Sequence, residues 1–107
     1  MAQKINITID QGTTFNTTFL IVDENDDLVD FTGYTANSQM RKTYTSSTAY
    51  PFTVGLSNAG VVTLSMSANA TNTITAGRYV YDVEVESAGI RSRIAEGIVT
   101  VTPQVTR

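Results

Sequence analysis

Alternating apolar and polar side chains dominate this sequence, and the alternation is clearest toward its C-terminal end. Between residues 79 and 86, two tyrosines and two valines alternate with one further valine and three acidic residues. A period of two is typical of a β-strand with one buried face. Ala88-Gly89 follows as a tight-turn signal, because glycine readily adopts positive φ. The pattern predicts one long hairpin from Gly77 to Pro103.

Pairing outward from this turn fixes the register of the hairpin. It predicts three cross-strand pairs: Glu86 with Arg91, Glu84 with Arg93, and Val83 with Ile94. Such pairs contribute about 0.2–1 kcal/mol each, and a slip by one residue would set apolar side chains against charges. Glycine inside a strand often marks a bulge or a bend, so we predict one of these at Glu96-Gly97.

The N-terminal part of the chain shows two more strand patterns. Ile5, Ile7 and Ile9 alternate with polar residues, which predicts a first strand that lies at a sheet edge. Thr13 to Val22 predicts a longer second strand. Its last three residues are apolar on both faces, which is typical of a central position in a sheet.

Further elements follow in the middle of the chain. Thr35 to Thr43 predicts a strand with small or apolar residues inward at positions 36, 38 and 40. Phe52 to Met66 predicts a second hairpin around Asn58-Ala59-Gly60, with the glycine in a left-handed bulge. This loop sets Leu56, Val54 and Phe52 opposite Val62, Leu64 and Met66. Ser67 to Ala76 breaks the alternation, and Ser67 could cap one helical turn there.

Length and composition narrow the fold class. The 107 residues suffice for one domain, residues 1–107, and the abundance of Thr, Val, Ile and Tyr favours β-structure. No apolar stretch approaches the roughly 20 residues of a membrane span, and we expect no signal peptide. The sequence alone therefore predicts a soluble, all-β, non-catalytic domain without a membrane partner.

Missing residue types and the net charge exclude several chemistries. The chain has no Cys, His or Trp, which removes disulfides, thiolate metal sites and the commonest general base. A net charge of −3 argues against a nucleic-acid partner, because a protein that binds nucleic acid normally carries a basic patch. We expect no enzymatic activity, no cofactor and no bound metal.

Two acidic clusters nevertheless invite a chemical interpretation. Asp82, Glu84 and Glu86 could form a catalytic or metal-binding group, but a solvated face paired with arginines explains them better. Asp23 to Asp27 has the D-x-N-x-D spacing of a calcium loop. Such a loop needs Gly and Glu where this chain has Leu28 and Tyr34, so an acidic turn is the preferred interpretation.

Tyrosine-rich and terminal segments are the candidate contact surfaces. The segment from Tyr44 to Pro51 predicts a polar loop whose tyrosines either contact a partner or fold over the edge of the core. Tyr34, Tyr44 and Tyr50 could also stack on sugars, although the absence of Trp counts against this. The residues predicted to form interfaces are Ile5, Ile7, Ile9, Tyr44, Tyr50, Val105 and Arg107.

Five segments together resemble a small module of tailed-bacteriophage virion proteins. They are Gln11–Phe15, Asp30–Ala36, Leu64–Ala68, Ala76–Glu84 and Glu96–Pro103. The chain is similar to the immunoglobulin-like N-terminal modules of phage baseplate and tail proteins and to small structural proteins of marine cyanophages. It departs from these relatives at Thr73–Thr75, where they often carry Leu and Pro.

The resemblance implies an Ig-like, antiparallel two-sheet β-sandwich of about seven to eight strands. It also implies a non-enzymatic virion structural protein: a capsid decoration protein or a tail, neck or baseplate component. Its partners would be other virion proteins and copies of itself, and it would reside in the virion after synthesis in the host cytoplasm. A carbohydrate- or host-surface-binding module is the alternative function. Exposed sheet edges need covering, which a symmetric assembly would provide.

Overall fold

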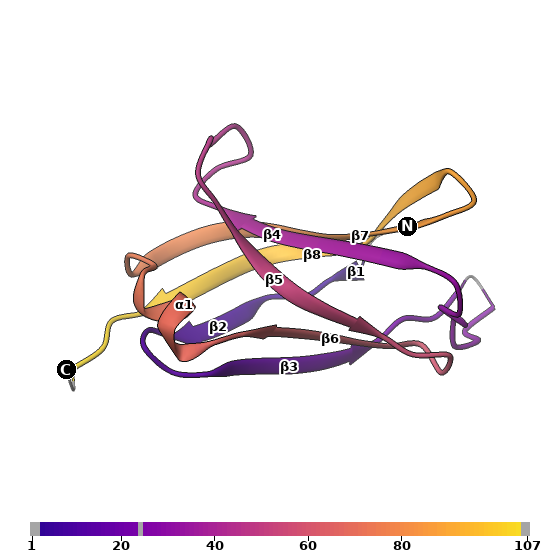
Figure 1. Ribbon diagram of the computed structural model, residues 1–107, viewed down its shortest axis with the longest axis horizontal. Coiled ribbons are helices and arrows are strands. Elements are labelled where there is room, and N and C mark those ends of the chain that lie inside the picture. Colours follow the sequence, from indigo (N-terminus) through magenta and orange to yellow (C-terminus); the bar gives the residue numbers. More distant parts are fainter. Residues whose placement is uncertain (1–2, 24, 106–107) are drawn as a thin grey trace.

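The computed structural model describes residues 3–23 and 25–105, and its regular secondary structure is almost entirely β-strand (Figure 1). In chain order the elements are β1 (Gln3–Lys4), β2 (Ile7–Asp10), β3 (Phe15–Leu20), β4 (Thr35–Arg41), β5 (Ala49–Leu56), β6 (Val61–Met66), α1 (Ala68–Asn72), β7 (Gly77–Ser87) and β8 (Ile90–Thr102). The all-β class predicted from composition and alternation is confirmed.

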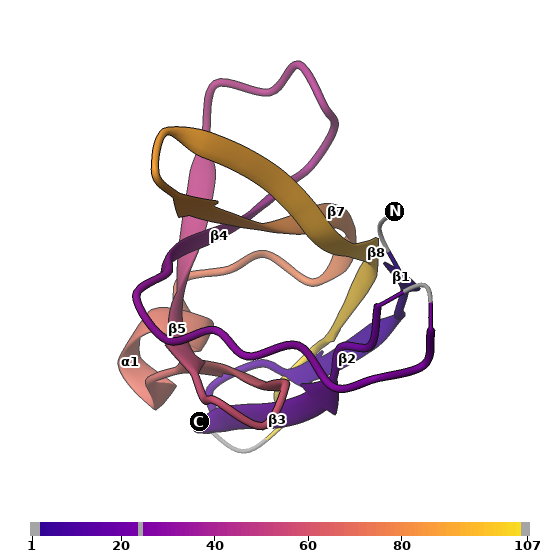
Figure 2. The same cartoon turned by 90° about the vertical axis from the view of Figure 1, so that its right-hand side faces the viewer.

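The strands form one continuous sheet that curls around the core. Its order is β1-β8-β7-β4-β5-β6-β3, and β2 also pairs with β8. β5 joins the two halves, because residues 49–52 pair with β4 and residues 53–56 pair with β6. The sheet is therefore a half-barrel (Figure 2), where the sequence predicted two separate sheets. β1 and β2 run parallel to β8, so a purely antiparallel sheet was also wrong.

Inward-facing residues of every long strand meet in one core. Ser38 and Met40 of β4 are buried and Ala36 is half-buried, as the alternation predicted. The Ser38 hydroxyl donates to the Asp82 carbonyl at 2.6 Å, so this buried polar group is satisfied. The largest fully enclosed apolar side chains are Ile9, Met40, Val62, Leu64, Ile74, Val83, Val99 and Val101.

The long hairpin forms as predicted at its tip and differs further along. Glu86 lies opposite Arg91 and Glu84 opposite Arg93, with positive φ at both turn residues. Val83, however, lies opposite Ala95 instead of Ile94, because the register shifts between Val83 and Glu84. At Glu96-Gly97 both residues pair regularly, with Asp82 and Tyr81, so the prediction of a bulge there was wrong.

Burial explains the position of this irregularity. Ala95, Val99 and Val101 are odd-numbered and point inward from β8. Without an extra residue, Arg91 and Arg93 would share that parity and enter the core, at the high cost of an unpaired buried charge. The extra residue, Ile94, turns both arginines outward while Ala95 stays inside.

Gly97 allows the backbone of the N-terminal segment to pack closely against β8. It sits regularly opposite Tyr81 in the β7–β8 ladder. A Cβ atom at this position would overlap the backbone carbonyl of Ile5. The same carbonyl accepts a 2.6 Å hydrogen bond from the Tyr81 hydroxyl, and the Ile5 amide donates to Glu96. Gly97 thus makes room for the N-terminal segment.

The second hairpin and the helical turn follow the sequence pattern closely. Gly60 has φ +76°, and Val54 and Leu56 pair with Leu64 and Val62. Phe52 is the exception: it was expected opposite Met66, but it pairs with Ser38 where β5 has joined β4. The Ser67 hydroxyl caps α1 by accepting from the Ala70 amide. No helix of the described residues is long and apolar enough to cross a membrane.

Candidate functional site

A charged hollow lies on the outer face of β4, β7 and β8. Its volume is about 290 Å³. It is lined by Gln39, Arg41, Tyr44, Val80, Tyr81, Asp82, Glu84, Arg93 and Glu96. Residues from three strands and from the loop after β4 therefore meet here, although they are widely spaced in the sequence.

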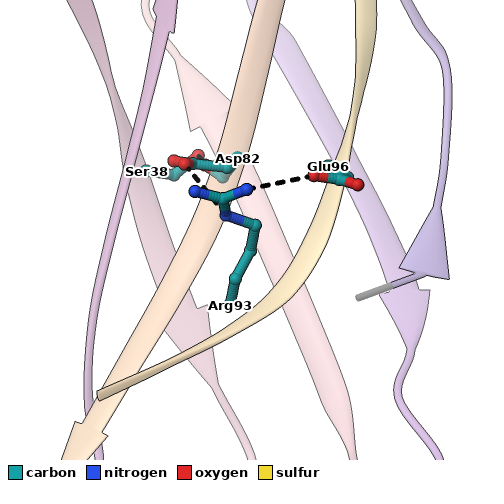
Figure 3. Close-up of polar contacts among 4 residues, drawn as sticks. All are labelled: Ser38, Asp82, Arg93 and Glu96. Atoms are coloured by element: carbon teal, nitrogen blue, oxygen red, sulfur yellow. Dashed lines mark hydrogen bonds and ion pairs between the residues drawn. The ribbon is translucent and has the colours of Figure 1, made fainter. Parts of the chain in front are cut away.

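Arg93 is the central charge of this hollow (Figure 3). Its Nε lies 3.3 Å from Oδ2 of Asp82, and its Nη1 lies 3.2 Å from Oε2 of Glu96. Arg93 therefore bridges two carboxylates, neither of them Glu84, its neighbour in the ladder. Exposed pairs of this kind contribute about 0–1 kcal/mol each, so the arrangement stabilises the face only modestly.

Arg41 connects the hollow to the loop between β4 and β5, which projects at the top of Figure 1. Its Nη1 donates to the Ser46 carbonyl at 2.6 Å, and its Nη2 donates to Oε1 of Gln39 at 3.1 Å. These bonds fasten the loop to the sheet. Tyr44, on the same loop, is 79% exposed at the rim of the hollow.

Asp82 has a pKa raised above its usual value. Partial burial is the main cause; Glu84 and Glu96 raise it further, whereas Arg93 and Arg41 lower it. The Asp82 carboxyl group thus binds its proton more tightly in the folded chain than in the unfolded chain. Asp82 consequently opposes folding above its folded pKa, and this penalty disappears as the pH falls below its unfolded value.

Removing the Arg93 charge should raise the pKa of Asp82 still further. Arg93→Gln deletes the nearest favourable charge and leaves burial, Glu84 and Glu96 acting in the same direction. NMR titration of the side-chain carboxyl carbons measures this pKa directly. Arg91→Gln is the matched control, since Arg91 pairs with Glu86 at 3.6 Å. An equal shift in both variants would contradict the assigned pairing.

The acidic clusters do not gather as metal sites within the described residues, where no group of three potential ligands is found. At the Asp23 turn, Oδ1 of Asp23 accepts hydrogen bonds from the amides of Asn25 and Asp27 at 2.8 and 3.1 Å. The carboxylate is used to close the turn, which agrees with the preferred interpretation of this segment.

The N-terminal strand was expected to make contacts through its isoleucine side chains, but these side chains face the core. Ile7 is 8% exposed and Ile9 is fully buried, so their side chains belong to the core. Ile5 is half-buried over Gly97. Contacts along β2 can therefore use its backbone and its outward residues, Thr8 and Asp10, but not the three isoleucine side chains.

The two loop tyrosines behave differently from each other. Tyr50 lies in β5, half-buried, with its ring 6.0 Å from that of Tyr79 in an edge-on arrangement. Tyr50 was expected in a loop, and its place in a strand corrects that prediction. Its packing over the core edge confirms one of the two alternatives given for the tyrosines of this segment, whereas Tyr44 is exposed for contact. Val105 is 91% exposed. The remaining predicted interface residue, Arg107, lies outside the described residues.

β3 ends the sheet and has an open backbone edge, which corrects the predicted central position. Just beyond the strand, the Ile21 amide donates to the Gly60 carbonyl, so odd-numbered residues bond toward β6. The amides and carbonyls of even-numbered residues alternate with these and point to the open side. Asn16, Thr18 and Leu20 therefore present backbone groups that have no strand partner within residues 3–23 and 25–105.

β2 has a second open edge, and it lies beside β3 at the same margin of the molecule (Figure 2). The Ile5 and Gln11 amides bond to β8 residues, which leaves the even-numbered backbone groups of β2 on the other side. A hollow of about 360 Å³ separates β2 from β3 and is lined by residues 5–8, 10 and 13–17. We call this margin the seam.

No protein-family model and no curated protein sequence matches this chain. Among solved structures, InlP of Listeria monocytogenes is similar over 94% of this chain and 28% of its own, at 15% identity and a TM-score of 0.51. This likeness concerns the fold alone.

Two further structures are more distant. One is a family 123 glycoside hydrolase from Clostridium perfringens, at 13% identity and a TM-score of 0.44, over 97% of this chain and 23% of its own. The other comprises the four N-terminal Ig domains of Dscam1 isoform 7.44, at 10% identity and a TM-score of 0.45, over 95% and 23%. The chain thus spans about a quarter of the chains it matches.

Proposed function

We propose that this chain is a non-enzymatic structural module of a tailed-bacteriophage particle, acting through protein–protein contacts in a symmetric assembly. The observation that carries the proposal is the seam, where neither β2 nor β3 pairs with another strand of the described residues along its outer edge. Of the outward backbone groups of β2, the Asp10 carbonyl accepts from Thr13 within the adjoining turn. An unpaired edge readily accepts a strand from another chain, and proteins normally cover it. Assembly into a particle would supply that cover. The curled sheet is on this view a variant of the Ig-like sandwich in which β5 passes between the layers.

The resemblance to phage virion modules supports the same function. Three of its five segments lie in the strand framework: the end of β6 with the start of α1, the first part of β7 and the last part of β8. The other two, Gln11–Phe15 and Asp30–Ala36, span the connections that lead into β3 and β4. The framework segments include Gly97 and Tyr81, which hold the N-terminal segment in place. The resemblance therefore extends through strands that build the sheet, as expected of a structural module.

Mass spectrometry of purified particles tests this function. We expect peptides of this chain in particles of the phage that encodes it. Separating head and tail fractions then assigns the location: high copy number in heads indicates a decoration protein, and low copy number in tails indicates a neck, tail or baseplate component. Absence from both fractions would contradict the proposal.

A carbohydrate-binding function is the second candidate, favoured by the charged hollow. Tyr44 provides an exposed aromatic face at its rim, and Gln39, Asp82 and Glu84 provide hydrogen-bonding groups beside it. Sugar-binding sites combine such polar groups with aromatic surface.

On this second hypothesis, Tyr44→Ala should abolish binding to any glycan retained on an array. Tyr44 is 79% exposed, so its removal should leave the fold intact. Tyr34→Ala is a matched control, because Tyr34 packs on Phe31 away from the hollow. An array without reproducible hits for the unmodified chain would reject the hypothesis.

A further inference from the structure

The β3 edge lacks the features that usually prevent edge-to-edge pairing. Natural edge strands are protected by lysine, proline, bulges or very short length. β3 reads FNTTFL over six residues and pairs with β6 in an unbroken register. Its open side therefore offers a regular row of backbone donors and acceptors to another strand.

The outward side chains near the end of β3 are apolar as well. Leu20 is 55% exposed, Val22 is 40% exposed and Leu28 is 50% exposed. Val22 and Leu28 lie opposite each other in an isolated antiparallel bridge, and Leu20 precedes Val22 on the same face. The three side chains form one exposed aliphatic group next to the open edge.

Charge indicates which partner this edge accepts. From Ile5 to Val22, across both strands of the seam, Asp10 is the only charged residue. Its Oδ1 already accepts a 2.7 Å hydrogen bond from the Thr102 hydroxyl. A second copy of the chain offers the same uncharged strand, and two net-negative chains meet there with the least repulsion.

We propose that residues 18–22, the end of β3 and the two residues after it, pair antiparallel with the same residues of a second copy about a two-fold axis at Leu20. In this register Leu20 faces its own symmetry mate, while Thr18 faces Val22 of the other copy. All three residues have the even parity that places backbone groups on the open side. Leu20, Val22 and their partners cover each other, and a continuous sheet runs through both molecules.

This interface is small. Pairing two short edges buries less than the roughly 1,000 Å² expected of a stable interface, so the isolated dimer is weak and reversible. Repetition in an assembly would strengthen it, because linked copies act at high effective concentration. The inference deepens the proposed function by naming the partner of one open edge.

Sedimentation over a range of concentrations tests the pairing in the isolated chain. We expect a reversible monomer–dimer equilibrium for the unmodified protein. Leu20→Lys sets two like charges face to face at the axis and should weaken the dimer at least about tenfold. Thr53→Lys adds the same charge to an exposed site of the internal strand β5 and should leave the equilibrium unchanged.

Cysteine cross-linking tests the register, since the chain has no cysteine of its own. Under mild oxidation, Leu20→Cys should form a disulfide-linked dimer faster than Thr18→Cys, because only residue 20 meets its own copy. Faster linkage through residue 18 would overturn the register.

A monomer at every concentration, or equal dimerisation of the Leu20→Lys and Thr53→Lys variants, would overturn the self-pairing. These results are independent of particle composition. Peptides found in particles together with a monomeric isolated chain would overturn only the self-pairing. A dimer together with absence from particles would overturn only the virion function.

Discussion

Gly97→Ala is expected to lower the free energy of unfolding by about 3 kcal/mol, at the upper end of the range for overpacking. The new methyl group would overlap the Ile5 carbonyl, a backbone atom that Tyr81 and Glu96 hold in place from both sides of the residue. Because the backbone must move, β1 and the start of β2 should separate from β8. The melting temperature should fall by roughly 12 °C or more.

Gly55→Ala provides the matched control for this substitution. A Cβ at position 55 would meet only the Thr63 Cβ at 3.7 Å, an ordinary van der Waals contact. Its effect should be neutral or slightly stabilising, since glycine is entropically unfavourable inside a strand. Urea denaturation of both variants compares them directly. Equal stability of the two would contradict the close approach of Ile5 to Gly97.

Thr71→Val should destabilise the chain by about 1–3 kcal/mol, because it leaves two backbone groups without their partner. Thr71 is completely buried on α1. Its hydroxyl donates to the Thr13 carbonyl at 2.7 Å and accepts from the Gly12 amide at 3.1 Å. These bonds hold the turn between β2 and β3 against the helix, so they also maintain the end of the seam.

Thr71→Ser separates the hydroxyl from the methyl group of this residue. It keeps both hydrogen bonds and removes one methyl, so most of the stability lost in Thr71→Val should be retained. Thermal unfolding monitored by circular dichroism measures the difference. If serine and valine were equally destabilising, packing of the methyl group and not hydrogen bonding would explain the role of Thr71.

Local pattern predicted the hairpins well, because their pairing depends on residues close in sequence. The opposed charges at Glu84 and Arg93, and the left-handed glycine at position 60, were both found. Gly97 shows the limit of such reasoning. A glycine in a strand permits either a bulge or a close backbone approach. The choice depended on Ile5, which is distant in sequence.

The position of β3 in the sheet also depended on distant residues. Apolar residues on both faces at Leu20–Val22 are equally compatible with a central strand and with an edge covered by another molecule. Strand order decides between them, and local periodicity carries no information about strand order. The mismatch between an apolar outer face and an edge position is what singles out this surface.

The charged hollow was predictable in part. The sequence indicated that acidic residues of β7 would pair with arginines of β8. It could not indicate that Arg41 joins them from β4, or that this arginine fastens the loop carrying Tyr44. The sequence allowed Tyr50 to fold over the core edge but could not identify its partner, because Tyr79 is brought beside it only by the folded sheet.

Openness of the β3 edge underlies both the proposed function and the self-pairing, and residue-resolved amide hydrogen exchange tests it most directly. In dilute protein, the amides of Thr18 and Leu20 should exchange rapidly, whereas those of Thr17 and Phe19 should be protected by β6. As the concentration rises, Thr18 and Leu20 should become protected as well. Protection of these two amides in the dilute monomer would contradict an open edge.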